Sequence, residues 1–168
     1  TNIEVIDQLC QRKVHITGVA TGFHELDAKT AGLQKSDFIV IAGRPSMGKS
    51  ALATSILEYV GAVTKVPCAF FSLEMSREQM GQRMLCSIAR LNATKVRSGF
   101  LAQGDWSKLM DAANKLSESP IYIDDTASIS TLELRAKARR LKTKHDIQLI
   151  VIDYLQLMRS SARGENRQ

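Results

Sequence analysis

The sequence lacks any apolar run that approaches the roughly 20 residues needed to cross a membrane as a helix. Its first residues, Thr-Asn-Ile-Glu, also lack the charged segment and apolar core of an export signal. These absences indicate a protein with no membrane-embedded part, and we expect it in the cytoplasm. With 168 residues, 44% of them hydrophobic and 24% charged, the chain suits one globular domain rather than a disordered segment.

Cysteine and histidine are scarce, with three residues of each type. Cys10, Cys68 and Cys86 are widely spaced and form no C-x-x-C pair, which argues against both a disulfide framework and a zinc site. The histidines have no metal-ligand spacing to one another. We therefore expect reduced cysteines in packing roles and no metal site built from these two residue types.

An eight-residue loop in the first third of the chain is its most informative feature. Residues 43–50, Gly-Arg-Pro-Ser-Met-Gly-Lys-Ser, match every fixed position of the phosphate-binding pattern G-x-x-x-x-G-K-[S/T]. Glycine at both ends lets backbone N–H groups curl around an anion, Lys49 supplies positive charge for the β- and γ-phosphates, and Ser50 supplies a hydroxyl for Mg²⁺. The pattern predicts a site for a nucleoside triphosphate and Mg²⁺, with the binding residues Gly43, Arg44, Pro45, Ser46, Met47, Gly48, Lys49, Ser50 and Ala51.

The residues on either side of the loop have the pattern that such a loop requires. Residues 38–42 form an apolar run of strand length, and residues 51–60 have apolar positions at helical spacing, with Gly61 placed to end the helix. A helix that starts at the loop would direct the positive end of its dipole at the phosphates. This order of strand, loop and helix favours a nucleotide site over the alternative, a glycine-rich turn with an accidental lysine.

Apolar runs that alternate with helical stretches predict the fold class. Besides residues 38–42, strands are expected at residues 68–72, 121–123 and 149–152. Each connection is long enough for a crossover, so we predict an α/β fold with a parallel sheet covered by helices on both faces.

The helical stretches carry their own start signals. Ser76 with Gln79, and Ser130 with Glu133, have the spacing of capping boxes. The helix that follows Ser76 is expected to run through Leu91, and residues 96–100 and 106–116 add shorter helical stretches, with a break near Gly99 and Gly104. Trp106 is expected to anchor the core of this helical insert.

Acidic residues follow the predicted strands, and the carboxyl ends of parallel strands share one edge of a sheet. Asp153 fits the acid that holds Mg²⁺, usually through water, and its alternative role is a strand-end cap. Glu74 could align water for attack on the γ-phosphorus and accept its proton, or it could stabilise the N-terminus of the helix that follows. For Asp124 and Asp125 we favour turn and capping chemistry.

Basic residues gather in the last third of the chain, whose overall net charge is +6. Residues 134–144 form a helix with a strongly basic face, which is either simply solvated or in contact with nucleic acid or a partner. The final segment, residues 159–168, is polar and carries Arg159, Arg163 and Arg167. An anionic partner is therefore favoured, although moderate basicity does not by itself identify nucleic acid.

Three segments together resemble a known family. Residues 43–50, Phe-Ser-Leu-Glu-Met at 71–75 and Ile-Asp-Tyr-Leu-Gln-Leu-Met at 152–158 are similar to the first three motifs of DnaB-type hexameric replicative helicases. Residues 21–27 and 31–33 also resemble the start of the RecA-like motor domain of that family. The resemblance implies a RecA-like P-loop NTPase core that uses ATP and Mg²⁺, with Lys49 and Glu74 as catalytic residues and Ser50 and Asp153 as metal ligands.

The resemblance also implies a domain organisation and a set of partners. Residues 1–17 would be a linker helix and connector that docks on the adjacent subunit, although an ordinary N-terminal helix packed on its own core fits the pattern equally well. Residues 18–158 would be the ATPase core, and residues 159–168 a loop facing single-stranded DNA, with Arg159, Arg163 and Arg167 as backbone contacts. The implied partners are single-stranded DNA, further copies of the chain in a homo-hexamer, primase and a helicase loader.

We therefore expect the motor domain of an ATP-dependent replicative DNA helicase. The chain lacks a collar domain, a γ-phosphate sensor and an arginine finger, so we expect its core to be incomplete at the C-terminus and inactive alone. One alternative is a RecA-like recombinase or repair ATPase, which shares the nucleotide chemistry but forms filaments. A second alternative is a non-catalytic ATP-binding module that assembles a ring.

Overall fold

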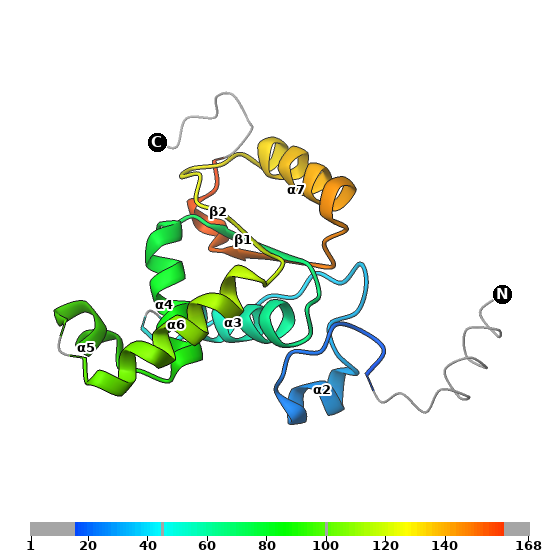
Figure 1. Ribbon diagram of the computed structural model, residues 1–168. Helices are drawn as coiled ribbons and strands as arrows, with labels where there is room; N and C mark the ends of the chain where they lie inside the picture. The colour runs from blue at the N-terminus through cyan, green and yellow to red at the C-terminus, as the bar shows by residue number, and fades with distance from the viewer. Residues whose placement is uncertain (1–15, 45, 100, 160–168) are drawn as a thin grey trace.

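A computed structural model describes residues 16–44, 46–99 and 101–159 (Figure 1). Its helices are α2 (His24–Thr30), α3 (Lys49–Glu58), the π-helix η1 (Tyr59–Val63), α4 (Arg77–Ala89), α5 (Ala93–Ser98), α6 (Gln103–Ser117), α7 (Thr131–His145) and the 3₁₀-helix η2 (Leu155–Leu157). Its strands are β1 (Cys68–Ser72), β2 (Ile121–Asp124) and β3 (Leu149–Asp153). Within the described ranges, no helix is both long and apolar enough to cross a membrane.

The strands form one parallel sheet in the order β2-β1-β3, which confirms the predicted α/β class. Cys68 of β1 lies opposite Ile121 of β2 and Leu149 of β3, so the three strands run together from this level. The connections from β1 to β2 and from β2 to β3 contain helices α4 to α6 and helix α7. Parallel strands need such long crossovers, because a strand must return to the same end of the sheet before its neighbour can begin.

Helices cover both faces of the sheet (Figure 1). The side chains of β1 divide between these two faces. Cys68 and Phe70 belong to the apolar cluster formed with α3 and α4, whereas Ala69 and Phe71 belong to the cluster under α7. This alternation follows from the two-residue period of a strand. Because both faces are covered, every residue of β1 is buried, which explains why its first four residues are apolar.

Residues 38–42 were predicted as a fourth strand. The structure describes all of these residues, and the prediction is wrong. These residues have no assigned strand, and their side chains are largely exposed, with Phe38 at 78% and Val40 at 64%. A strand requires a neighbour to satisfy its backbone N–H and C=O groups. No described strand pairs with this segment, and β3 is paired only on its β1 side. An apolar run identifies a segment suited to a sheet, but pairing depends on what lies beside it.

Gly61 does not end the helix after the phosphate loop, as its residue type had indicated. The chain continues from α3 directly into η1, and Gly61 is buried within it. A Cβ atom on Gly61 would collide with the side chain of Ile121. Glycine at this position therefore permits close packing of η1 against β2, which is a tertiary requirement and not a helix stop.

The prediction that Trp106 anchors the core is also wrong, because its side chain is 63% exposed. Helix α6 packs against α4, and its buried residue is Ala112, with Leu116 partly buried against the main core. Trp106 lies on a different face of α6. Large aromatic residues are usually buried, but the face of a helix that meets its neighbour decides which side chains are covered.

The predicted starts of two long helices are confirmed. Ser76 accepts a hydrogen bond from the backbone N–H of Gln79, and the Gln79 side chain accepts one from the backbone N–H of Ser76. Ser130 and Glu133 form the same reciprocal pair at the start of α7. Each pair satisfies two backbone N–H groups that have no partner inside the helix.

Asp27 ties the first described segment to helix α2. It is 3% exposed, and its carboxylate accepts hydrogen bonds from the Thr21 backbone and hydroxyl and from the Gly22 backbone. Burial raises the pKa of Asp27, but the hydrogen bonds from Thr21 and Gly22 outweigh it, so the pKa lies below its ordinary value. The ionised carboxylate is therefore part of the folded structure.

Replacing Asp27 with asparagine is expected to lower the free energy of unfolding by about 1–3 kcal/mol at pH 7, because charge-assisted hydrogen bonds are removed. A carboxyl whose folded pKa is depressed stabilises the fold above its unfolded pKa, and this stabilisation disappears as pH falls through the folded pKa. The difference between wild type and variant should therefore shrink below about pH 4. Urea unfolding at pH 7, 5, 4 and 3 measures this difference in the free energy of unfolding. Asp111→Asn, on the exposed side of α6, is the control. A difference that is constant across this range would contradict the expectation.

Candidate nucleotide-binding site

The phosphate loop leads directly into helix α3. Gly48 is the N-cap residue, with φ 86° and ψ 20°, and the helix begins at Lys49. A Cβ atom on Gly48 would meet nothing within 4 Å, so protein packing does not explain glycine here. The left-handed backbone conformation does explain it, because residues with a side chain rarely adopt this conformation.

The N-terminus of α3 has the features of an anion site. No side chain caps it, and its first turn contains no acidic residue. Helices α4 and α7, in contrast, begin with side-chain caps. The first backbone N–H groups of a helix have no partner inside it and carry partial positive charge. A phosphate group fits this end of α3, and the loop residues fit the predicted nucleotide.

Lys49 extends from the start of α3 towards the end of β3. A Cβ atom on Gly43 would lie 3.5 Å from Lys49 Cγ, which places the lysine chain next to the first glycine of the loop. At its far end, the ammonium nitrogen is 5.6 Å from the centroid of the Tyr154 ring. Tyr154 was not among the predicted site residues, although its position directly after Asp153 could have indicated it.

Asp153 ends β3 and lies opposite Ser72 of β1. The residue is 7% exposed, and its backbone C=O accepts a hydrogen bond of 2.7 Å from the N–H of Leu73. Among described residues, none forms a hydrogen bond or ion pair with its carboxylate. A carboxylate with no hydrogen-bond partner among the described residues is available to a cation.

The residues present fit Mg²⁺ bound together with a nucleotide. The described residues contain no cluster of three or more His, Cys, Asp or Glu side chains that could hold a metal alone. Mg²⁺ does not need such a cluster, because it is usually held by one or two protein oxygens, waters and substrate phosphates. The Ser50 hydroxyl and the Asp153 carboxylate supply oxygens of this kind.

Glu74 lies in a short turn beyond β1, and its side chain is exposed. The Ser72 hydroxyl donates a hydrogen bond of 2.6 Å to the C=O of Met75 and accepts one of 3.2 Å from the Met75 N–H. These bonds fix the turn that contains Glu74. Because Ser72 is paired with Asp153, the turn begins beside the end of β3. The catalytic role of Glu74 stays a prediction, as does its alternative role at the start of α4.

The predicted turn and capping roles of Asp124 and Asp125 are confirmed. Asp125 accepts a hydrogen bond of 3.0 Å from the backbone N–H of Arg77 at the start of α4. Asp124 accepts one from the N–H of Thr126 and forms an ion pair of 2.6 Å with Lys137. Burial raises the pKa of Asp124, but the hydrogen bonds from Lys137 and Thr126 outweigh it and hold the pKa below its ordinary value.

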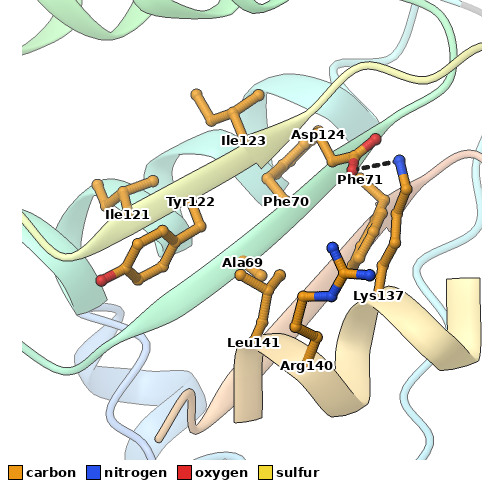
Figure 2. A pocket seen from close by; sticks show the side chains of 10 residues that line it. All are labelled: Ala69, Phe70, Phe71, Ile121, Tyr122, Ile123, Asp124, Lys137, Arg140 and Leu141. Carbon is orange, nitrogen blue, oxygen red and sulfur yellow. Dashed lines mark hydrogen bonds and ion pairs between the residues drawn. The ribbon is translucent and has the colours of Figure 1, made fainter. Parts of the chain in front are cut away.

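The Asp124–Lys137 pair borders a cavity of about 520 Å³ between the sheet and α7 (Figure 2). Figure 2 shows Lys137 and Arg140 reaching from the helix towards the β2 side of this cavity. Its lining includes Tyr122 and Leu141, but none of the predicted nucleotide-binding residues. The cavity is therefore separate from the phosphate loop.

Arg159 is the one predicted DNA contact within the described residues. It is exposed, and its backbone N–H donates a hydrogen bond of 3.1 Å to the C=O of Ile129, just before α7. Arg163, Arg167 and Pro45 lie outside the described residues, as does most of the predicted linker helix.

Comparison with known proteins gives the family. A profile of the DnaB-like helicase C terminal domain matches residues 18–168. The chain belongs to this family. Among its relatives, the replicative DNA helicase DnaC of Bacillus subtilis is 51% identical over 164 residues, and the replicative DNA helicase DnaB of Geobacillus stearothermophilus is 50% identical over the same length. Each alignment covers 97% of this chain but 36% of the relative, so the chain spans about a third of the length of these helicases.

Solved structures agree with this assignment to the DnaB-like family. One solved ATPase domain has a TM-score of 0.90 at 32% identity, and the similarity covers 98% of this chain and 59% of that one. A DnaB-like replicative helicase, described with its interactions with primase, has a TM-score of 0.89 at 32% identity and is covered over 40% of its length. The fold is therefore that of the RecA-like ATPase domain of DnaB-like helicases.

Proposed function

We propose that this chain is part of the ATPase motor of a bacterial replicative DNA helicase. Hydrolysis of ATP would drive movement along single-stranded DNA and separate the duplex at the replication fork in the cytoplasm. The observation that carries the proposal is the approach of Lys49 to the end of β3, where its ammonium nitrogen lies 5.6 Å from the ring of the residue after Asp153. This approach supports one site that includes both the loop lysine and the strand-end acid.

Each proposed role follows from the chemistry of a side chain. Lys49 and the N-terminus of α3 would neutralise the phosphates, and Ser50 with Asp153 would hold Mg²⁺, which would neutralise charge on the terminal phosphates. Glu74 would orient a water molecule and accept its proton. Gly43 to Ala51 would supply the backbone contacts that fix the phosphate chain before reaction.

The proposed partners follow from the family and from charge. As a member of the DnaB-like family, the chain would work in a homo-hexamer with ATP bound between subunits. Arg159, together with Arg163 and Arg167, would contact the backbone of single-stranded DNA. One similar structure is described with its interactions with primase, which supports primase as a partner. A helicase loader is the further partner that we expect.

The experiment that tests this function compares ATP hydrolysis with and without single-stranded DNA, and measures unwinding of a forked duplex, using the full-length protein. We expect stimulation of hydrolysis by DNA and unwinding that requires ATP and Mg²⁺. ATP binding without DNA-stimulated phosphate release would favour the ring-assembly module. Filaments on DNA in electron micrographs, in place of closed six-membered rings, would favour a recombinase.

Replacing Arg159 with alanine is expected to weaken binding of single-stranded DNA to a similar degree for every sequence, since an arginine bound to phosphate reads no base information. The slope of log affinity against log salt concentration should become shallower by about 0.7 for each phosphate that the variant no longer neutralises. Fluorescence anisotropy with oligo-dT and a mixed sequence, at a series of salt concentrations, measures both quantities. Arg83→Ala, at an exposed arginine on α4, is the matched control. An unchanged slope for Arg159→Ala would remove this residue from the DNA surface.

A further inference from the structure

The lysine of the phosphate loop lies near the ring of Tyr154, a residue of the motif at 152–158 that has no role assigned to it above. We propose that Tyr154 is a positioning residue of the ATPase site, whose ring holds the Lys49 ammonium group ready for the β- and γ-phosphates. This inference rests on the proposed function of the site and adds to it a residue that acts through Lys49 and does not itself touch the nucleotide.

The geometry of the contact is that of a cation–π interaction. The Lys49 ammonium nitrogen lies 5.6 Å from the Tyr154 ring centroid, within the limit of about 6 Å at which a cation is attracted by the face of a ring. A Cβ atom added to Gly43 would lie 3.5 Å from Lys49 Cγ, so the lysine stem runs beside the first glycine of the loop. The side chain of Lys49 therefore runs from the loop to Tyr154, and the ring restricts the position of its ammonium group.

Tyr154 is itself held in place by the residues around it. Asp153, which precedes it, is paired with Ser72 and accepts a hydrogen bond from Leu73. The C=O of Tyr154 accepts a hydrogen bond of 3.1 Å from the N–H of Leu157 as η2 begins. Its backbone is thus fixed on both sides, which gives the lysine a rigid surface. Among the described residues, none hydrogen-bonds the Tyr154 hydroxyl, and the contact with Lys49 is made by the ring.

Confinement of Lys49 improves binding through entropy. A free lysine side chain loses rotamer freedom when it binds a phosphate, and a side chain that is already confined loses less. The ammonium group keeps its contact with the ring while its N–H groups bind a phosphate, so the cation–π attraction contributes to the affinity. The ring therefore favours the phosphate-binding position without competing strongly for the charge.

The test is a double-mutant cycle in the full-length protein, with a fluorescent N-methylanthraniloyl ATP as the probe. Tyr154→Leu is expected to weaken binding of the probe by about two- to fivefold, the range of an exposed cation–π contact, and to raise the KM for ATP more than it lowers kcat. Tyr154→Phe keeps the ring and should bind as wild type does. In a Lys49→Ala background, Tyr154→Leu should change the affinity no further.

The outcomes separate this inference from the proposed function. An equal decrease in affinity for Tyr154→Leu in both backgrounds, or no decrease in either, would overturn the positioning role. Wild type that does not bind the probe, or Lys49→Ala that binds as well as wild type, would overturn the proposed function itself. Thermal melting of each variant establishes folding, and if Tyr154→Leu does not fold, Tyr154→Met removes the ring while keeping a large apolar side chain.

Discussion

Replacing Lys49 with alanine is expected to weaken ATP binding about a hundredfold and to abolish measurable ATP turnover and unwinding. Charge-assisted hydrogen bonds contribute about 1.5–3 kcal/mol each, and the loop lysine is expected to reach two phosphates. The loss of two bonds near the lower end of this range corresponds to about a hundredfold in affinity. Titration with a fluorescent ATP analogue and a phosphate-release assay measure both effects.

The control for this variant is Lys115→Ala, which removes the same charge from the exposed surface of α6. It should leave both binding and turnover unchanged, so the effect of Lys49→Ala cannot come from net charge alone. Thermal melting should show little change for Lys49→Ala, because no ion pair with Lys49 is found among the described residues. Turnover at the wild-type rate would remove Lys49 from the site.

Replacing Glu74 with glutamine is expected to leave ATP binding within about twofold while kcat falls by about 10²–10⁴, the usual contribution of a general base. Glutamine has nearly the same shape as glutamate but cannot accept the proton of the attacking water at neutral pH. The side chain is exposed on a turn fixed by Ser72, so the fold should tolerate the change. Single-turnover hydrolysis with saturating ATP separates this chemical defect from product release.

The same variant decides between the two roles predicted for Glu74. If the carboxylate only stabilised the N-terminus of α4, the substitution would lower stability by about 0.3–1 kcal/mol and leave kcat unchanged. Glu78→Gln is the matched control, because Glu78 is an exposed acid in the first turn of α4. We expect Glu78→Gln to lower turnover less than Glu74→Gln does. Equal kcat values for Glu74→Gln and wild type would exclude the catalytic role.

Local chemistry in the sequence was enough to predict much of this molecule. The capping boxes at Ser76 and Ser130 depend on residues three positions apart, and both form as predicted. The continuous apolar run of β1 predicted a strand covered on both faces, because only such a strand has no polar side. The phosphate loop could also be predicted from the sequence, since its fixed positions fall within eight consecutive residues. In each case, the interacting groups are near neighbours in the chain.

The sequence by itself therefore determined the α/β class, the family and the loop at the start of α3. Only the tertiary structure decided that residues 38–42 have no strand partner in the described sheet, that Gly61 lies against Ile121, and that Lys49 meets Tyr154. Lys49 and Tyr154 are far apart in the chain, and no local pattern relates them. Contacts of this kind depend on how helices and strands pack, so residue type and short-range spacing could not reveal them.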